Sequence, residues 1–119
     1  MGMKELLKDL ENVRPHDTDE FTRGKFYSFP RACGCPLTEL AIQQDLMLRP
    51  ITYYGGITPA QSQDRLSIEV CDKLAVAYNV TNVDLEEVYM TFDHNTEGVP
   101  ASFVRLQYTI KVLRERYGV

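Results

Sequence analysis

The chain has 119 residues, 44% of them hydrophobic and 25% charged, and carries a net charge of −4. This length suits one domain with one core, and the composition excludes a wholly disordered protein. The apolar runs are far shorter than the roughly 20 residues of a membrane span, and the charged N-terminus is unlike a signal peptide. We therefore expect a single globular domain over residues 1–119, located in the cytoplasm and away from membranes. The acidic balance disfavours nucleic acid as a direct partner, because phosphate binding needs a positive field.

Hydrophobic periodicity predicts a mainly α, single-domain bundle of about five helices. Their expected ranges are 3–13, 36–47, 59–78, 83–92 and 100–117. Pro36, Pro59 and Pro100 stand at or near the first position of a helix, where a proline sacrifices no hydrogen bond. Thr58 and Gln61 form a capping-box pattern around Pro59. The apolar stripes predict the core residues Leu74, Tyr78, Leu85, Val88, Phe92, Leu106 and Ile110.

The aromatic run 25–29, which ends at Pro30, forms either a short strand or a loop that packs on the core. As a strand it would pair with residues 50–54 in a small β-hairpin. Tyr53 and Tyr54 in that second segment precede two glycines, so aromatic faces lie beside flexible backbone. This pattern suits a ligand or partner surface. One tyrosine that packs inward while the other shields the loop explains it as well.

The chain has three cysteines, and an odd number without a secretory segment indicates a reducing compartment. A single residue separates Cys33 from Cys35, whereas structural zinc pairs usually have about two to four residues between ligands. Only His16 and His94 could supplement them as ligands. We therefore expect small buried thiols, with no disulfide between Cys33 and Cys35, no metal and no cofactor.

The common motifs of hydrolases and nucleotide-binding proteins are absent: Gly-x-Ser-x-Gly, P-loop, His-Glu-x-x-His and Gly-x-Gly-x-x-Gly. The densest cluster of reactive side chains is Asp93-His94-Asn95, in which histidine can act as an acid or base near neutral pH. These residues are also good turn formers, and adjacent loop residues usually point apart. The cluster is therefore either a site or a turn at the end of a helix.

Acidic residues dominate 84–97 and form an acidic strip of Asp84, Glu86, Glu87, Asp93 and Glu97. In the same region, the helices expected at 59–78 and 83–92 can be read as a helix-turn-helix, whose second helix would enter the major groove. The first turns of that second helix carry carboxylates, which DNA phosphates repel. Packing of two core helices is the alternative reading.

Three segments follow one another in a recognisable order. Residues 21–24 read Phe-Thr-Arg-Gly before the aromatic run, 33–41 read Cys-Gly-Cys-Pro-Leu-Thr-Glu-Leu-Ala, and 92–95 read Phe-Asp-His-Asn before the closing helix. In this order the chain resembles a group of small uncharacterised bacterial and phage proteins. Their pattern is aromatic-x-x-Gly, Cys-x-x-Gly-Ala-Leu, and Trp-Asn-Asp before a Gly-Thr turn. The tryptophan and the Asn-Asp order are missing here, and Gly34 is out of phase. The resemblance implies an accessory or phage-type protein and carries over no catalytic residue.

These features favour a small acidic, non-enzymatic binding protein that binds or inhibits a host protein, as an accessory factor of a phage or mobile element. Tyr53 and Tyr54 would supply contact area. The acidic strip would cover a basic channel of the partner.

Three other functions stay open. An oligomer that binds or sequesters a nucleotide-like small molecule would stack a base on tyrosine or Phe92 and meet phosphate with Arg105 or Arg114. The coiled-coil-like spacing of the last helix would build that homo-oligomer. The other two are a helix-turn-helix DNA-binding regulator and an enzyme that uses His94 with Asp93. The candidate binding residues are therefore Tyr53, Tyr54, Asp84, Glu86, Glu87, Phe92, Asp93, His94, Asn95 and Arg105, and no catalytic residue is assigned.

Overall fold

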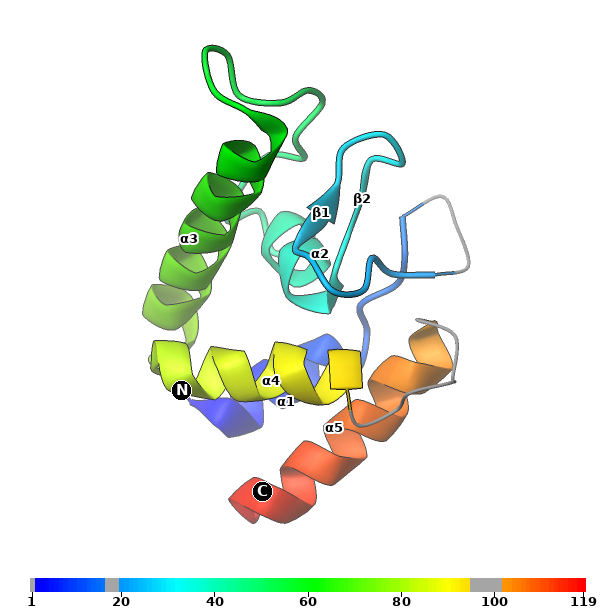
Figure 1. Cartoon of the computed structure of the whole chain (residues 1–119). Coiled ribbons are helices and arrows are strands. Elements are labelled where there is room, and N and C mark those ends of the chain that lie inside the picture. Colours follow the sequence, from blue (N-terminus) through cyan, green and yellow to red (C-terminus); the bar gives the residue numbers. More distant parts are fainter. Residues whose placement is uncertain (1, 17–19, 95–101) are drawn as a thin grey trace.

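The computed structural model describes residues 2–16, 20–94 and 102–119. Within these ranges the chain forms five helices and one short hairpin (Figure 1), which confirms the mainly α prediction. In chain order the elements are α1 (Met3–Leu10), β1 (Tyr27–Ser28), β2 (Cys33–Gly34), α2 (Pro36–Gln43), α3 (Pro59–Tyr78), α4 (Asn82–His94) and α5 (Phe103–Tyr117).

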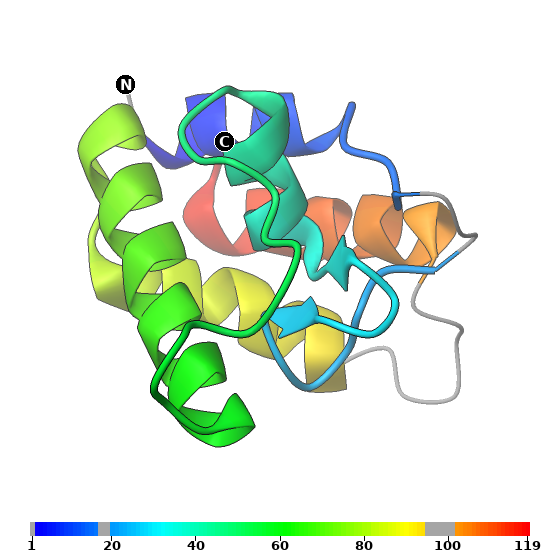
Figure 2. The same cartoon turned by 90° about the horizontal axis from the view of Figure 1, so that it is seen from above.

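Helix α1 lies at the centre of the packing, because it contacts α2, α3 and α5. Helix α4 packs on both α3 and α5, and the hairpin packs on α2 through β2. Figure 1 shows α3 as the long upright helix on one side of α2, with α4 crossing at its lower end. Seen from above, α2 and the hairpin lie over the layer that α4 and α5 form (Figure 2). The segment between α2 and α3 runs across the top of the molecule.

Local capping explains where α3 begins and ends. The Thr58 hydroxyl accepts the Gln61 N–H at 3.1 Å, and the Gln61 side chain accepts the Thr58 N–H at 3.0 Å. This reciprocal pair satisfies two amides that the first turn leaves open. Asn79 ends the helix in the left-handed conformation, with a φ of 53°. The predicted range 59–78 is therefore confirmed at both ends.

The other helix boundaries differ from the sequence expectation by a few residues. Helix α1 stops at Leu10, and α2 stops at Gln43 because Asp45 adopts a left-handed φ of 58°. Leu46 then donates its N–H back to Ala41, which turns the chain out of the helix. Helix α4 spans Asn82–His94 and is longer than the expected 83–92. Ser102 caps α5, whereas the expected start at Pro100 lies outside the described residues.

The aromatic run forms a strand, but the expected pairing with 50–54 is wrong. Strand β1 pairs antiparallel with β2, in the register Tyr27 with Gly34 and Ser28 with Cys33. The Gln63 side chain on α3 takes the opposite edge of β1, because its amide bonds both the N–H and the carbonyl of Tyr27. Residues 50–54 therefore find no backbone partner on β1.

Gly34 is required by the close approach of β2 to α2. A Cβ atom built at position 34 would lie 2.7 Å from the Thr38 Cβ, which is far inside van der Waals contact. The small residue therefore lets the hairpin sit directly on the first turn of α2.

The predicted core is confirmed residue by residue. All seven apolar side chains named from the periodic stripes are buried, and Leu74, Leu85 and Leu106 have no exposed surface at all. Val13 is also buried although α1 ends before it, because the chain continues into the core in a tight turn.

We expect Leu106→Ala to lower the free energy of unfolding by about 2–5 kcal/mol, because it leaves a cavity in a fully packed core. Urea denaturation monitored by circular dichroism measures this change. Val104→Ala is the control, since Val104 lies on the same helix with 71% of its surface exposed. It should change stability by less than about 0.5 kcal/mol. Equal effects of the two substitutions would contradict the packing described here.

Candidate functional site

The segment between α2 and α3, residues 44–58, is called here the display loop. It contains Leu48 and Ile51, the two most exposed large apolar side chains among the described residues, at 91% and 87%. Tyr53, another member of the loop, is 42% exposed. A connection of this length without secondary structure is uncommon in a compact domain and is usually functional or disordered. The contacts of its backbone distinguish these two cases.

A bidentate ion pair anchors the first half of the display loop. Arg49 donates from Nη2 to Glu39 Oε1 at 2.6 Å and from Nη1 to Glu39 Oε2 at 2.7 Å. Glu39 on α2 is completely buried, and its Oε2 also accepts the Gly34 N–H at 2.9 Å. Arg49 Nη1 reaches the Ala32 carbonyl at 3.0 Å. One guanidinium therefore ties the loop to α2 and to the turn of the hairpin.

The hydrogen bonds to Glu39 raise the pKa of Arg49 above its already high usual value. Arg49 thus stays protonated throughout the physiological range. A planar guanidinium that faces a carboxylate with two parallel bonds also fixes orientation, which a lysine in its place would not do.

Further contacts anchor the second half of the loop. The Tyr27 hydroxyl donates to the Pro50 carbonyl at 2.8 Å. Tyr54 donates its N–H to Ser62 Oγ at 3.1 Å and its hydroxyl to Glu69 Oε2 at 3.1 Å. These bonds alternate along the chain with the exposed aliphatic side chains. The loop is therefore held in one shape while Leu48 and Ile51 stay in solvent.

The two predicted tyrosines take the divided roles that the sequence left open. Tyr54 is half-buried and lies under the Arg65 guanidinium, which is 5.0 Å from its ring centroid. Tyr53 packs its ring on Phe29 at 4.5 Å between centroids but keeps an exposed face. An open groove of about 540 Å³ runs along this side of the loop, between residues 47–55 and Glu69. Both tyrosines line this groove, and Tyr53 is the more exposed of the two.

The acidic strip has structural partners within the chain. Asp84 forms a reciprocal cap with Thr81 at the start of α4 and accepts the Tyr117 hydroxyl at 3.0 Å. This carboxylate raises the pKa of Tyr117, which burial has already raised, to about 12. Glu87 forms an ion pair with Arg116. Glu86 is exposed, and Glu97 lies outside the described residues. Contact of this strip with a partner stays a prediction.

Phe92, Asp93 and Arg105 are brought together at the end of α4, where they hold two helices together. Arg105 is fully buried and donates from Nε to the Phe92 carbonyl at 2.6 Å and from Nη2 to the Asp93 carbonyl at 3.0 Å. Helix ends leave such carbonyls without partners, so this guanidinium from α5 caps α4. Arg23 Nε reaches the same Asp93 carbonyl at 3.1 Å.

The side chains of Asp93 and His94 differ in burial. Asp93 is 9% exposed, and burial raises the pKa of its carboxyl, whereas His94 is exposed. Successive residues of a helix point about 100° apart, so the carboxylate is poorly placed to orient the imidazole. Asn95 lies outside the described residues. This geometry gives no support to an enzyme based on His94.

The proposed nucleotide-like site is not assembled in this structure. Phe92 and Arg105 lie in the core, while the display loop with Tyr53 runs along the opposite side of the molecule (Figure 1). Arg114 contacts Glu11. The apolar stripe of α5 is also used internally, since Leu106, Ile110 and Leu113 are buried. A homo-oligomer through this helix would have to use its other face, which exposes Val104 and Tyr108.

The cysteines lie in or beside the core. Cys35 Sγ is 3.5 Å from the Thr38 hydroxyl, and burial raises the pKa of Cys35 to about 11. Cys33 directs its sulfur toward the Glu20 carbonyl at 3.4 Å. Within the described ranges no three His, Cys, Asp or Glu side chains form a group that could hold a metal ion.

None of the described helices is both long and apolar enough to cross a membrane. Comparisons with protein-family models, curated protein sequences and solved structures gave no match. The resemblance to small bacterial and phage proteins therefore stays a prediction, and the function has to be argued from geometry.

Sequence reasoning missed the Arg49–Glu39 pair and the exposure of Leu48 and Ile51. The pair joins residues from two different segments, so no periodic pattern in the sequence predicts it. Leu48 and Ile51 do carry a signal, because they flank Pro50 in a stretch without helical or strand periodicity. Apolar residues in such a stretch either fold back onto the core or stay exposed, and only the tertiary contacts decide between the two.

We expect Arg49→Met to lower the free energy of unfolding by about 2–4 kcal/mol, because it leaves the buried Glu39 carboxylate without its counterion. Amide hydrogen exchange in residues 46–54 should accelerate as well. Arg116→Met is the matched control, since its ion pair with Glu87 is exposed at both ends. That control should cost about 1 kcal/mol or less. A protected loop in Arg49→Met would refute the anchoring role.

The thiols should react in an order set by burial. Cys71 is only partly buried, whereas Cys35 is 3% exposed. With a maleimide near neutral pH, mass spectrometry after digestion should find Cys71 modified first and Cys35 protected in the folded protein. In denaturant without reductant all three cysteines should be modified. Loss of two reactive groups under those conditions would reveal a disulfide.

Proposed function

We propose that the chain is a non-enzymatic binding protein that inserts the display loop into an apolar pocket of a partner protein. The observation that carries this proposal is the exposure of Leu48 and Ile51 on a loop anchored by a buried ion pair. Leu48 and Ile51 lie close together in the sequence of this loop, and apolar side chains gathered on one part of a surface typically mark an interaction site. The backbone around these two side chains is held by Arg49, the Pro50 carbonyl and Tyr54. A loop whose apolar side chains were exposed only for lack of structure would not have such contacts.

The energetics fit such an insertion. Complete burial of a leucine or isoleucine side chain contributes about 1.5–3 kcal/mol each, so these two side chains form a plausible hot spot. The loop is already ordered by Arg49, Pro50 and Tyr54, so binding loses less conformational entropy than with a flexible segment. Tyr53 extends the same contact with a ring that is rigid and amphipathic.

The acidic character of the chain then raises the rate of association with the partner more than the affinity. The net charge of −4 favours association with a basic partner surface. Two carboxylates of the acidic strip are engaged by Tyr117 and Arg116, and the display loop therefore supplies most of the binding energy. A cytoplasmic accessory role in a phage or mobile element belongs to this proposal. The three free cysteines support this location, because free thiols are typical of a reducing compartment.

The experiment that tests the proposal compares two double variants with the wild type. Leu48→Ser with Ile51→Ser removes the exposed apolar side chains of the display loop. Val76→Ser with Val104→Ser removes two others, which are 85% and 71% exposed on α3 and α5. Proteins captured from the source cells are identified by mass spectrometry, and each candidate is then purified and titrated by calorimetry.

A partner of the display loop should bind the wild type and the Val76/Val104 variant equally. The loop variant should bind at least about 100-fold more weakly, as expected for the loss of a hot spot. Retention of binding by the loop variant would refute the proposal. Sedimentation of the wild type alone decides whether the partner is a second copy of the chain.

A further inference from the structure

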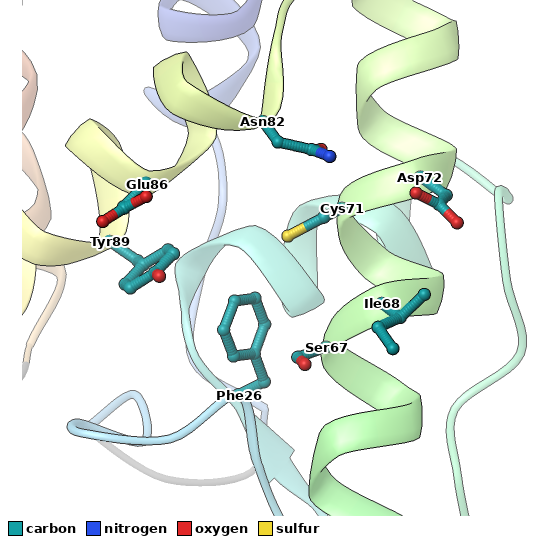
Figure 3. A pocket seen from close by; sticks show the side chains of 8 residues that line it. All are labelled: Phe26, Ser67, Ile68, Cys71, Asp72, Asn82, Glu86 and Tyr89. Atoms are coloured by element: carbon teal, nitrogen blue, oxygen red, sulfur yellow. The ribbon is translucent and has the colours of Figure 1, made fainter.

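A pocket between α3, α4 and the segment before β1 has a lining that differs from that of the display loop. Its volume is about 290 Å³, and eight residues line it (Figure 3): Phe26, Ser67, Ile68, Cys71, Asp72, Asn82, Glu86 and Tyr89. Neither the sequence motifs nor the proposed function uses this pocket.

The aromatic side of the pocket comes from two elements. Phe26 and Tyr89 pack edge to face, with ring centroids 5.1 Å apart. Figure 3 shows the Phe26 ring pointing up from its loop, between α3 and α4, with Tyr89 beside it. The Cys71 sulfur points from α3 into the same space. These groups give the pocket an apolar, polarisable floor.

The charged side of the pocket is entirely negative. Asp72 on α3 and Glu86 on α4 are both exposed, and none of the eight lining residues is a lysine, arginine or histidine. The electrostatic influence of these carboxylates reaches the floor: after burial, Asp72 raises the pKa of Cys71, and Glu86 raises that of Tyr89. Cys71 and Tyr89 therefore stay protonated and neutral near pH 7.

Two neighbouring features could oppose this field. The positive end of the α4 dipole lies near Asn82, but the Asp84 carboxylate accepts the Thr81 N–H there and offsets it. Lys25 lines a smaller hollow of about 60 Å³ that shares Phe26 and Tyr89 with the pocket. Asp93 lines that hollow as well, so a carboxyl group accompanies Lys25 there.

From this lining we infer that the pocket binds a small organic cation, an ammonium group carried on a short apolar chain. An ammonium is attracted to the faces of aromatic rings and to carboxylates. The hydrocarbon part of the ligand would pack against Phe26, Cys71 and Ile68. The hydroxyl of Ser67 and the amide of Asn82 can accept its remaining N–H groups. An anion of the same size would meet two carboxylates and no counter-charge.

The test is a titration of the ¹⁵N-labelled protein with n-butylammonium chloride. Two-dimensional amide NMR measures the binding. Residues 67–72 and 82–89 should shift in a saturable manner. n-Butanol and sodium butyrate, which share the hydrocarbon chain, should bind at least about tenfold more weakly. Equal shifts with butyrate would overturn the inference.

Variants that replace a carboxylate by a neutral amide identify the groups that bind the ammonium. Asp72→Asn and Glu86→Gln should each weaken butylammonium binding about fivefold, as expected for a single exposed charge pair. Glu115→Gln removes one exposed carboxylate from α5, outside the pocket, and should bind like the wild type. Unchanged spectra outside the pocket show that each variant is folded. Equal weakening by Glu115→Gln would show that only net charge matters, and would refute a specific pocket.

One further measurement distinguishes the two sources of such a cation, a lysine side chain of another protein and a free amine. A short uncharged peptide that contains a single lysine offers the same ammonium on a side chain. Tighter binding of the peptide than of butylammonium would assign the pocket to a lysine of another protein. Tighter binding of butylammonium would assign it to a free amine. Binding of neither ligand would overturn the inference.

Discussion

The burial of one carboxylate, Glu39, is the constraint on which the upper half of the molecule depends. An ionised group without exposed surface is very unfavourable unless charge and hydrogen bonds compensate it. Here the compensation comes from outside its own helix, from the Arg49 guanidinium and the Gly34 amide. Helix α2 can therefore bury its inner face only when the hairpin and the display loop are both in place. Formation of the core and presentation of Leu48 and Ile51 are in this way one cooperative event.

Arg105 has a comparable role in the lower half. Its guanidinium is buried among α4, α5 and the segment before β1, and it bonds the last carbonyls of α4. Both buried charges thus join elements that follow one another in the chain, and both bond backbone groups of those elements. Sequence analysis proposed Arg105 as a phosphate ligand of a nucleotide-like site. Its burial is a property of how α5 crosses α4, which no single helix reports.

The parts of the fold that follow local rules could be predicted from the sequence. Periodic apolar stripes together with the Thr58–Gln61 cap and Asn79 defined α3 at both ends, and the same stripes identified the core. The partner of β1 could not be predicted, because a Gln63 side chain on a distant helix takes the strand edge that 50–54 was expected to fill. For the candidate site, Tyr53 and Tyr54 pointed to the right loop. Which tyrosine is exposed was decided by the Ser62 and Glu69 contacts of Tyr54.

A substitution at Gly34 would alter the conformation of residues that Gly34 does not contact. A methyl group at this position would meet the Thr38 Cβ and push β2 away from α2. The Gly34 amide would then leave the Glu39 carboxylate, and the Ala32 carbonyl, two residues earlier, would withdraw from Arg49. The display loop would lose its alignment although none of its own residues had changed. Position 34 is therefore a remote determinant of the recognition surface: a single carbon atom there would act on Leu48 and Ile51 through a chain of three residues.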